Sequence, residues 1–275
     1  MQNKLDKKVI EDFGSEWTRF SNNVVEEKAQ KKIFDQYFSI FPKNKLNKLN
    51  IGFDMGCGSG RWAYFLAPIV KKIYCIEPSN AIYIAQEKLK KFKNCVYVKK
   101  QVLHNGLKKN YFDFGYCLGV LHHIQDTQGG LNNCVKILKK NSPLLLYLYY
   151  DFENKNFIYK SVWKISNLFR ILISSAPKCI KYLICDFIAL IIYWPLAKFA
   201  LIFDKIGVNQ KNIPLYFYKD LSFYHMRNDA LDRFGTKVEK RYSRIKITFM
   251  MKKAGLHRIK FSKKEPFWCA VGYKK

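Results

Sequence analysis

The segment Phe53-Asp54-Met55-Gly56-Cys57-Gly58-Ser59-Gly60 constrains the fold of this chain more than any other part of the sequence. It closes a short apolar run, 51–54, and opens a helical pattern. Because three of its positions are glycine, the backbone of the turn carries no side chains there, so a ligand can lie directly on it and meet backbone N–H groups. The pattern indicates a strand–loop–helix unit of an α/β fold, with a ligand site at the loop.

A second apolar run, 73–76, ends at Glu77, twenty-three positions after Asp54. An acidic residue at this separation typically accepts hydrogen bonds from both hydroxyls of a ribose. The dinucleotide pattern G-x-G-x-x-G would require glycine at 61, where Arg61 stands, so the spacing disfavours a pyrophosphate. A ribose without a phosphate fits S-adenosylmethionine, which we expect as the cofactor.

Beyond the glycine loop, the chain resembles the class I methyltransferases. Residues 112–124 are similar to the fourth strand of that family and the loop after it. Four further stretches, 13–17, 147–152, 231–236 and 266–272, are similar to a poorly characterised bacterial branch often associated with surface-glycan gene clusters. The resemblance covers nearly the whole chain. It implies methyl transfer from S-adenosylmethionine to a small or lipid-linked acceptor, such as a sugar or glycan precursor.

The resemblance also implies which residues contact the cofactor. The methionine side is assigned to Asp54, Gly56, Cys57, Gly58, Ser59 and Gly60. Glu77 matches the ribose-binding acid, Gln101 is the best candidate to meet the adenine, and Leu118 ends the fourth strand. The loop after that strand lacks an N-P-P-Y-type signature of amino-group methylation, which favours an oxygen or carbon acceptor.

Repeated alternation of strand and helix patterns predicts a doubly wound, mostly parallel sheet. Nearly continuous apolar runs, typical of strands buried on both faces, occur at 51–54, 73–76, 95–99, 112–120 and 144–150. Helical patterns occur at 24–38, 61–70, 79–92 and 127–139. Ser243 is expected to cap a helix that ends at Gly255, and the runs 256–262 and 267–273 follow as a hairpin-like pair. The resemblance implies that this pair completes a seven-stranded sheet.

We therefore expect four parts in the chain. Residues 1–50 form an N-terminal helical cover, 51–151 the cofactor-binding core, 152–242 a helical insertion or acceptor lid, and 243–275 a C-terminal helix and hairpin. The insertion is too long to be a loop of a compact domain.

The first half of the insertion, 157–203, is rich in Ile, Leu, Phe, Tyr and Trp. Charges interrupt it, and its longest uncharged run, 187–197, is far shorter than the roughly 20 residues that span a bilayer. A transmembrane helix is not expected. Two interpretations remain and can coexist: a cap over the active site, or a basic amphipathic surface that rests on a membrane. Pro177 and Pro195 are expected to mark helix boundaries or a kink.

The formal net charge is +28, with an excess of +3 in residues 1–50, +9 in 51–150 and +16 in 151–275. The basic half is the one expected to handle the acceptor, which suggests an anionic partner: a phosphate-bearing glycan, a lipid headgroup or RNA. A solvated lysine coat of a chain from an AT-rich genome explains the charge equally well. Basic residues do not interleave with stacking aromatics, so nucleic acid is the less favoured acceptor.

Methyl transfer from a sulfonium is an in-line displacement, so the protein must align the acceptor and, for a hydroxyl, remove a proton. The candidate bases are His122 and His123, which follow the fourth strand, and Asp151, which follows the fifth. Structural roles, such as capping a turn, packing beneath the cofactor or capping the next helix, explain the same residues. Tyr150 and Arg233 are candidates for binding the acceptor, although Arg233 also fits an exposed helix position.

Two other functions remain open: an RNA methyltransferase, and a cofactor-binding or inactive subunit that docks on a membrane or a protein. Residues 1–30 alternate charges without an apolar core, so no signal peptide is expected and the protein is expected in the cytoplasm, with peripheral contact to the inner face of the membrane through 157–203. The eight cysteines show no C-x-x-C spacing and are interpreted as buried thiols, with neither metal nor disulfides. The oligomeric state is left open.

Overall fold

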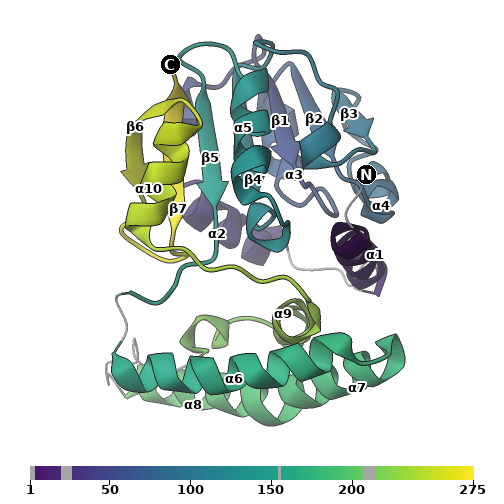
Figure 1. The fold of residues 1–275 in the computed structure, drawn as a ribbon, viewed down its shortest axis with the longest axis vertical. Helices are drawn as coiled ribbons and strands as arrows, with labels where there is room; N and C mark the ends of the chain where they lie inside the picture. The colour runs from purple at the N-terminus through teal and green to yellow at the C-terminus, as the bar shows by residue number, and fades with distance from the viewer. Residues whose placement is uncertain (1–3, 20–26, 154–155, 207–214) are drawn as a thin grey trace. The chain divides into compact units, whose positions relative to one another are not determined.

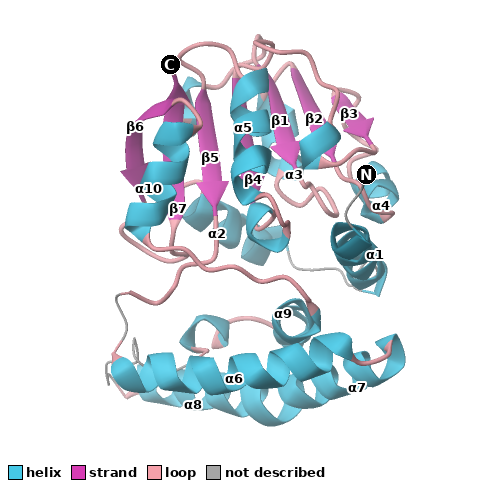
Figure 2. Ribbon diagram, viewed as in Figure 1, coloured by secondary structure: helices cyan, strands magenta, loops and turns pink. Residues whose placement is uncertain are grey.

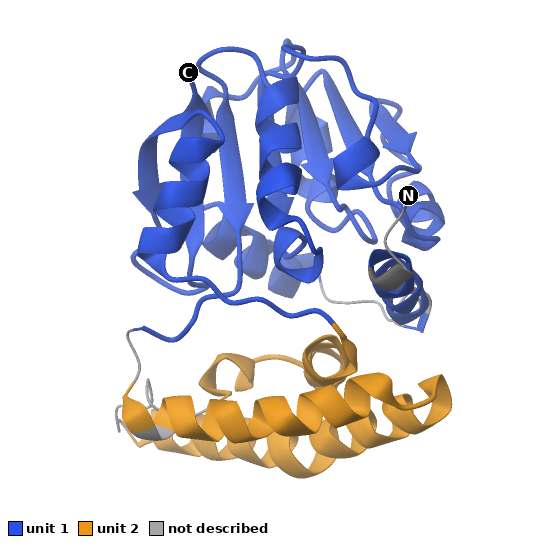
Figure 3. Ribbon diagram, viewed as in Figure 1, with its two compact units in different colours: residues 1–153, 238–275 blue, residues 154–237 orange. Residues whose placement is uncertain are grey.

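The computed structural model describes residues 4–19, 27–153, 156–206 and 215–275. The chain divides into two compact units (Figure 3). The first, here called the sheet unit, comprises residues 1–153 and 238–275, and the second, the helical unit, comprises residues 154–237.

The sheet unit contains one seven-stranded sheet in the order β3-β2-β1-β4-β5-β7-β6 (Figure 2). Its strands are β1 (Ile51–Met55), β2 (Lys72–Ile76), β3 (Cys95–Val98), β4 (Phe114–Leu118), β5 (Pro143–Tyr147), β6 (Leu256–Phe261) and β7 (Cys269–Lys274). Strands β1 to β5 are parallel, whereas β7 runs antiparallel to both β5 and β6. The predicted doubly wound sheet with an antiparallel edge is confirmed.

Two adjacent central strands show why these apolar runs form the middle of the sheet. Gly52 of β1 is paired with Phe114 of β4, and Phe53 with Gly115. A Cβ atom on Gly52 would lie 2.0 Å from the Phe114 ring, and one on Gly115 would lie 2.1 Å from the Phe53 ring. Each aromatic ring therefore occupies the space above a glycine, and both rings are fully buried, one in the core on each face of the sheet.

The helices of the sheet unit cover both faces of the sheet (Figure 1). They are α1 (Lys4–Arg19), α2 (Glu27–Tyr37), α3 (Ala63–Leu66), α4 (Ala81–Lys88), α5 (Thr127–Ile137) and α10 (Arg244–Lys253). The predicted helix 61–70 is shorter than expected, because Pro68 falls in a 3₁₀ turn, Ala67–Ile69, that directly follows α3. The predicted cap is confirmed: Ser243 Oγ accepts a hydrogen bond from the Lys246 amide at 3.2 Å. The first three residues of the predicted helix 24–38 lie outside the described residues.

The helical unit contains α6 (Phe157–Ser175), α7 (Lys178–Ile188), α8 (Trp194–Lys205) and α9 (Phe223–Gly235). Pro177 precedes the first residue of α7, as expected for a boundary. Pro195 lies in the first turn of α8, as expected for a boundary, although a π-helical turn, Ala189–Tyr193, joins α7 to α8 without a break. In the described part of the chain, this continuous helix, Lys178–Asp204, is the one long and apolar enough to cross a membrane by length and composition.

Candidate functional site

The glycine loop lies at the carboxyl ends of β1 and β2, where ligands bind in open α/β sheets. The amides of Gly56 and Cys57 both donate to the carbonyl of Ile76, at 2.8 and 3.0 Å. Gly56, Gly58 and Gly60 have φ angles of +75°, +53° and +74°, in the left-handed region that favours glycine. The loop is therefore folded tightly against the end of β2.

Glu77 joins the end of β2 to this loop. Its side chain is buried, with the residue 7% exposed, and its two carboxylate oxygens accept hydrogen bonds from the amides of Gly58, at 3.2 Å, and Ser79, at 3.0 Å. Burial raises the pKa of Glu77, and the hydrogen bonds from Ser79 and Gly58 oppose that shift. The expectation that the loop amides face a ligand is wrong for Gly56, Cys57 and Gly58, because these amides bond to β2 and Glu77.

Each glycine of the loop also has a neighbour that a larger residue would strike. A Cβ atom would lie 2.3 Å from Val120 at Gly56, 2.9 Å from the Trp17 ring at Gly58, and 2.8 Å from Leu89 at Gly60. Close approach and positive φ, rather than free N–H groups, are what require glycine at these three positions.

Helix α1 lies over the loop, a neighbour that the sequence pattern did not identify. The Trp17 ring lies against Gly58, and the Arg61 guanidinium is 5.3 Å from the centre of that ring. Phe13, one turn earlier, packs on the ring of His123 at 4.9 Å. The similarity of residues 13–17 to one methyltransferase branch was the only signal in the sequence for this contact.

Asp54 is the second buried acid of the site. Its residue is 1% exposed, and Oδ2 has no hydrogen-bond partner among the described residues. Burial raises its pKa to about 8, even though the neighbouring Tyr116 hydroxyl and the positive charge of Arg61 act in the opposite direction. In the cofactor-free protein Asp54 is therefore largely protonated near neutral pH.

We expect Asp54→Asn to change how the stability of the cofactor-free protein depends on pH. An aspartate whose folded pKa lies near 8 keeps its proton in the folded state, whereas the unfolded chain loses it near pH 4. The unaltered protein therefore loses stability as pH rises from about 4 to 8. The variant should be more stable by on the order of 1–3 kcal/mol at pH 8 and nearly equal at pH 4.5.

Urea unfolding at the two pH values measures this difference. Glu87→Gln is the matched control, because the Glu87 side chain is 72% exposed on α4 and no buried charge is removed. Equal slopes of stability against pH for Asp54→Asn and the unaltered protein would contradict the assignment.

His122 lies in the turn that follows β4. It is fully buried, and neither ring nitrogen has a hydrogen-bond partner among the described residues. Its ring stacks on Tyr149 at 3.8 Å, and burial, with the charges of His123 and Arg241, holds its pKa well below the usual value. The imidazole is therefore neutral at physiological pH.

His123 has a structural partner that sequence reasoning did not predict. Its Nδ1 donates to the carbonyl of Val238 at 2.7 Å, which fixes the ring beside the segment that returns from the helical unit to α10. Of the two histidines, His122 is thus the one with ring nitrogens left to meet a ligand.

An ion pair that the sequence did not single out lies beside His122. Arg241 Nε donates to Glu239 Oε1 at 2.8 Å, and the guanidinium lies 5.1 Å from the centre of the Tyr149 ring. Glu239 Oε2 is buried without a hydrogen-bond partner in the described structure. No local pattern marks this pair, because its neighbours Tyr149 and Tyr150, just after β5, are about ninety positions away in the sequence.

The remaining predicted residues have local partners. Asp151 is exposed, and its Oδ1 accepts from the Glu153 amide at 3.2 Å. The interpretation of Asp151 as the cap of the next helix is wrong, because Asn156 caps α6 through a hydrogen bond from Tyr159. Arg233 belongs to α9 and donates to Ser166 Oγ at 3.0 Å, so it is not an exposed helix arginine.

Three predicted contacts stay predictions. Gln101 begins the short 3₁₀ turn Val102–His104 after β3, and Leu118 is buried at the end of β4. The half-buried ring of Tyr150 packs on Phe267 at 5.7 Å. Among the cysteines, six are buried, but Cys179 is exposed, which corrects the expectation of buried thiols at that position.

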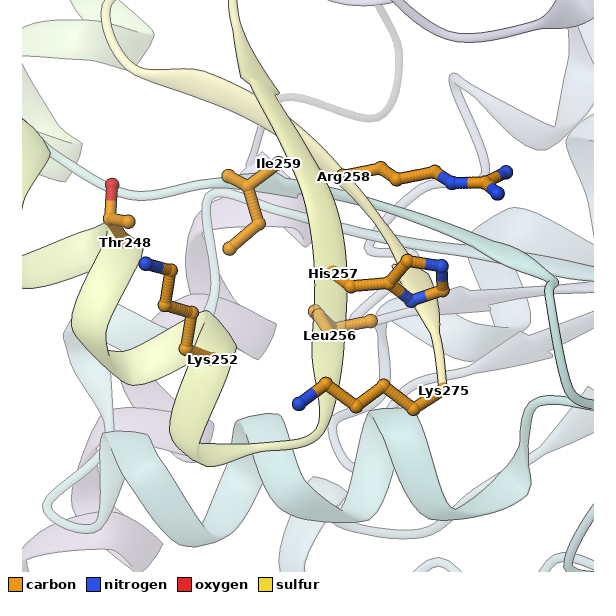
Figure 4. Close-up of a pocket in the computed structure, with 7 residues that line it drawn as sticks. All are labelled: Thr248, Lys252, Leu256, His257, Arg258, Ile259 and Lys275. Atoms are coloured by element: carbon orange, nitrogen blue, oxygen red, sulfur yellow. The ribbon is translucent and has the colours of Figure 1, made fainter.

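A surface pocket lies elsewhere on the sheet unit (Figure 4). It is lined by Thr248, Lys252, Leu256, His257, Arg258, Ile259 and Lys275. Strand β6 begins here, and the register places this end of β6 level with the amino end of β5. The pocket is therefore at the edge of the sheet opposite the glycine loop, and it contains none of the predicted site residues.

Comparisons with known proteins agree with this geometry. A family model described as a methyltransferase domain matches residues 53–146, about a third of the chain. This region runs from β1 to β5 and includes the glycine loop, Glu77 and His122. The chain therefore carries a methyltransferase domain. No curated protein matches the sequence significantly.

Solved structures share the fold of the methyltransferase domain at low sequence identity. A chain in the complex of the Haloferax volcanii Trm112 methyltransferase activator with a putative methyltransferase has a TM-score of 0.53 and 10% identity, covering 96% of this chain and 97% of its own. A possible histamine N-methyltransferase from Thermotoga maritima has a TM-score of 0.50 and 16% identity, and the match covers 94% of this chain and 100% of that one. A putative methyltransferase from Bacillus halodurans has a TM-score of 0.51 and 13% identity, and the match covers 83% of this chain and 71% of that one. By contrast, the chain spans 58% of the length of the YcgJ protein from Bacillus subtilis.

The cofactor of the methyltransferase domain is S-adenosylmethionine, and the residues present fit it. Glu77 is a buried carboxylate whose oxygens each accept one backbone hydrogen bond, which leaves lone pairs for the two ribose hydroxyls. The buried Asp54 Oδ2 without a partner is the second polar atom that a ligand would satisfy. A cation beside Asp54 favours its carboxylate form.

Proposed function

We propose that the protein is an S-adenosylmethionine-dependent methyltransferase that methylates an oxygen, or a carbon, of a sugar or glycan precursor, either small or lipid-linked. S-adenosylmethionine supplies the methyl group on a sulfonium. The observation that supports an oxygen acceptor best is His122, a neutral, fully buried imidazole with two unpaired nitrogens at the carboxyl end of the parallel sheet. The sugar itself rests on the resemblance to a glycan-associated branch.

In this proposal His122 orients the acceptor and takes its proton. A neutral imidazole nitrogen accepts a hydrogen bond from a hydroxyl, and the proton passes to it as the oxygen–methyl bond forms. Tyr149 holds the imidazole by stacking, and Arg241 lies on the same tyrosine. Because burial keeps the pKa of His122 low, this group stays neutral between pH 6 and 8. The methylation rate should therefore not fall in this range through protonation of His122.

The rim around this histidine suits a sugar. The rings of Tyr147, Tyr149, Tyr150 and Trp268 are half-buried and lie at the carboxyl end of β5 or the start of β7. Trp268 Nε1 is buried and has no hydrogen-bond partner in the described structure. Aromatic faces with a few convergent polar groups are typical of small-molecule sites. Asp151 remains a further candidate base, and Tyr150 remains a candidate contact of the acceptor.

The acceptor is tested with methyl-labelled S-adenosylmethionine and three pools: soluble nucleotide sugars, extracted lipid-linked glycans and total RNA. We expect label in a glycan pool. We expect His122→Phe to lower the rate roughly 100-fold without weakening S-adenosylhomocysteine binding. Phenylalanine keeps the stacking on Tyr149 but offers no nitrogen.

His104→Phe is the matched control, because His104 is exposed in the turn after β3. It should leave the rate unchanged. Label in RNA alone would overturn the glycan acceptor and favour an RNA methyltransferase. Cofactor binding with no label in any pool would favour an inactive, cofactor-binding subunit.

A further inference from the structure

Helix α6 has the reverse polarity of a helix in water. Its buried side includes Arg170 and Ser174, which are 8% and 4% exposed. Four large apolar side chains on the opposite side follow one another at spacings of three or four and are all more than half exposed: Val162, Ile165, Phe169 and Leu172. In water-soluble helices the apolar stripe is the one that faces the interior.

The continuous helix α7–α8 repeats this inversion. Its buried positions, three or four residues apart, are mostly small or polar: Lys181, Cys185, Ala189, Tyr193, Ala197 and Ala200. Its exposed positions include large apolar side chains that are 45% to 73% exposed: Leu183, Phe187, Leu190, Trp194, Phe199 and Ile202. The buried side of this helix is thus built from smaller or more polar side chains than its exposed side.

Helix α9 accounts for the polar side. Asp186 of α7 receives two hydrogen bonds from Arg227 of α9, at 2.9 and 3.0 Å. Tyr193 donates to Asp229 of α9 at 2.8 Å. Figure 1 shows α9 on one side of the layer formed by α6, α7 and α8. The described part of the helical unit offers no such partner to the apolar side of the layer.

We call this apolar side the outer face and define it by the exposed large apolar residues within 157–206. Of the 23 large apolar residues exposed in the described structure, 18 lie in this range. Eighteen large apolar side chains, each more than a third exposed, differ from the single, scattered apolar residues that are normal on a soluble surface. Such a face marks an interaction surface rather than ordinary surface.

The charge around the outer face indicates the partner. Residues 157–206 contain seven Lys or Arg and two Asp; Arg170 and Lys181 are buried on the inner side, whereas Lys164, Lys178 and Lys198 are exposed. Two copies of such a face would repel each other, whereas an anionic bilayer offers both hydrocarbon for the apolar side chains and phosphates for the lysines. We propose that the outer face docks on the surface of an anionic phospholipid bilayer.

The docking is peripheral. The helix Lys178–Asp204 has the length and composition to cross a bilayer, but its Asp186 and Tyr193 are bonded to Arg227 and Asp229 of α9. Crossing would carry these charged groups of α9 into the hydrocarbon, which costs several kcal/mol per charge. With the helices lying flat, the outer face enters the lipid and the polar side stays in water.

Co-flotation of the full chain with vesicles tests the proposal. We expect binding to vesicles of phosphatidylcholine with phosphatidylglycerol, and weak binding to phosphatidylcholine alone. The triple variant Leu183→Gln, Phe187→Gln and Leu190→Gln should bind at least 10-fold more weakly. Lys164→Gln with Lys198→Gln should remove much of the preference for the anionic vesicles.

Matched variants elsewhere separate docking from general stickiness. Leu49→Gln, Ile245→Gln and Phe249→Gln change three equally exposed apolar residues of the sheet unit and should leave binding unchanged, as should Lys48→Gln with Lys109→Gln. Urea unfolding and S-adenosylhomocysteine titration of each variant show that the fold is kept. Equal flotation of both triple variants would overturn the proposal. So would a dimer, seen by light scattering, that only the outer-face variant dissociates. Neither result bears on methyl transfer.

Discussion

Glu77→Ala is expected to weaken S-adenosylhomocysteine binding by on the order of 1,000-fold, measured by isothermal titration calorimetry. Hydrogen bonds to a buried charged group contribute about 1.5–3 kcal/mol each, and the ribose offers two. The variant also leaves the amides of Gly58 and Ser79 without their acceptor, so the glycine loop loses one of its hydrogen bonds to the end of β2. Both effects act on the same part of the site, and each 1.4 kcal/mol is a tenfold loss of affinity.

Glu87→Ala is the matched control for this variant. Glu87 lies ten positions later on α4, its side chain is 72% exposed, and its carboxylate pairs with Lys90 at the surface. The control should bind S-adenosylhomocysteine as the unaltered protein does. If a well-folded Glu77→Ala protein bound with unchanged affinity, the ribose assignment would be wrong. If the unaltered protein itself did not bind, the docking-subunit interpretation would replace the enzyme.

Gly58→Ala is expected to abolish detectable binding, a loss of at least roughly 1,000-fold. The backbone at Gly58 has φ +53°, and an added Cβ would lie 2.9 Å from the Trp17 ring of α1. The methyl group therefore strains the loop and displaces Trp17 of α1, which lies over the loop. The Gly58 amide would also lose its alignment with Glu77.

Gly255→Ala separates the strain of the backbone from its effect on the site. Gly255 has φ +91°, between α10 and β6, and a Cβ atom there would have nothing within 4 Å. Both variants should lose about 1 kcal/mol of folding stability from the left-handed backbone. Only Gly58→Ala should lose the ligand. If both variants bound S-adenosylhomocysteine with similar affinity, the glycine loop would be a structural turn and not part of the ligand site.

The two proposals concern different parts of the chain. The acceptor depends on His122 and its neighbours in the sheet unit, and the docking surface depends on α6 to α8 in the helical unit. A lipid-linked glycan precursor would be presented at the surface on which the outer face is proposed to rest. Each can fail without the other, because vesicle binding needs no methyl transfer and label in a soluble nucleotide sugar needs no membrane.

The sequence by itself determined the sheet and the cofactor. In a chain with alternating strand and helix patterns, short continuous apolar runs predict strands buried on both faces of a sheet. The residues from Asp54 to Gly60, and Glu77, lie at the ends of two of those runs in the sequence. Local patterns of this kind survive in any context, because burial and positive φ act on neighbouring residues.

Only the tertiary structure decided what surrounds that site. Trp17 meets Gly58, and Glu239 and Arg241 come beside His122, across distances in sequence that no periodicity encodes. Burial, which depends on the whole fold, made His122 neutral and raised the pKa of Asp54. The outer face was likewise visible in the sequence only as an apolar stretch. Which side of each helix points outward depends on where α9 and its charged residues pack.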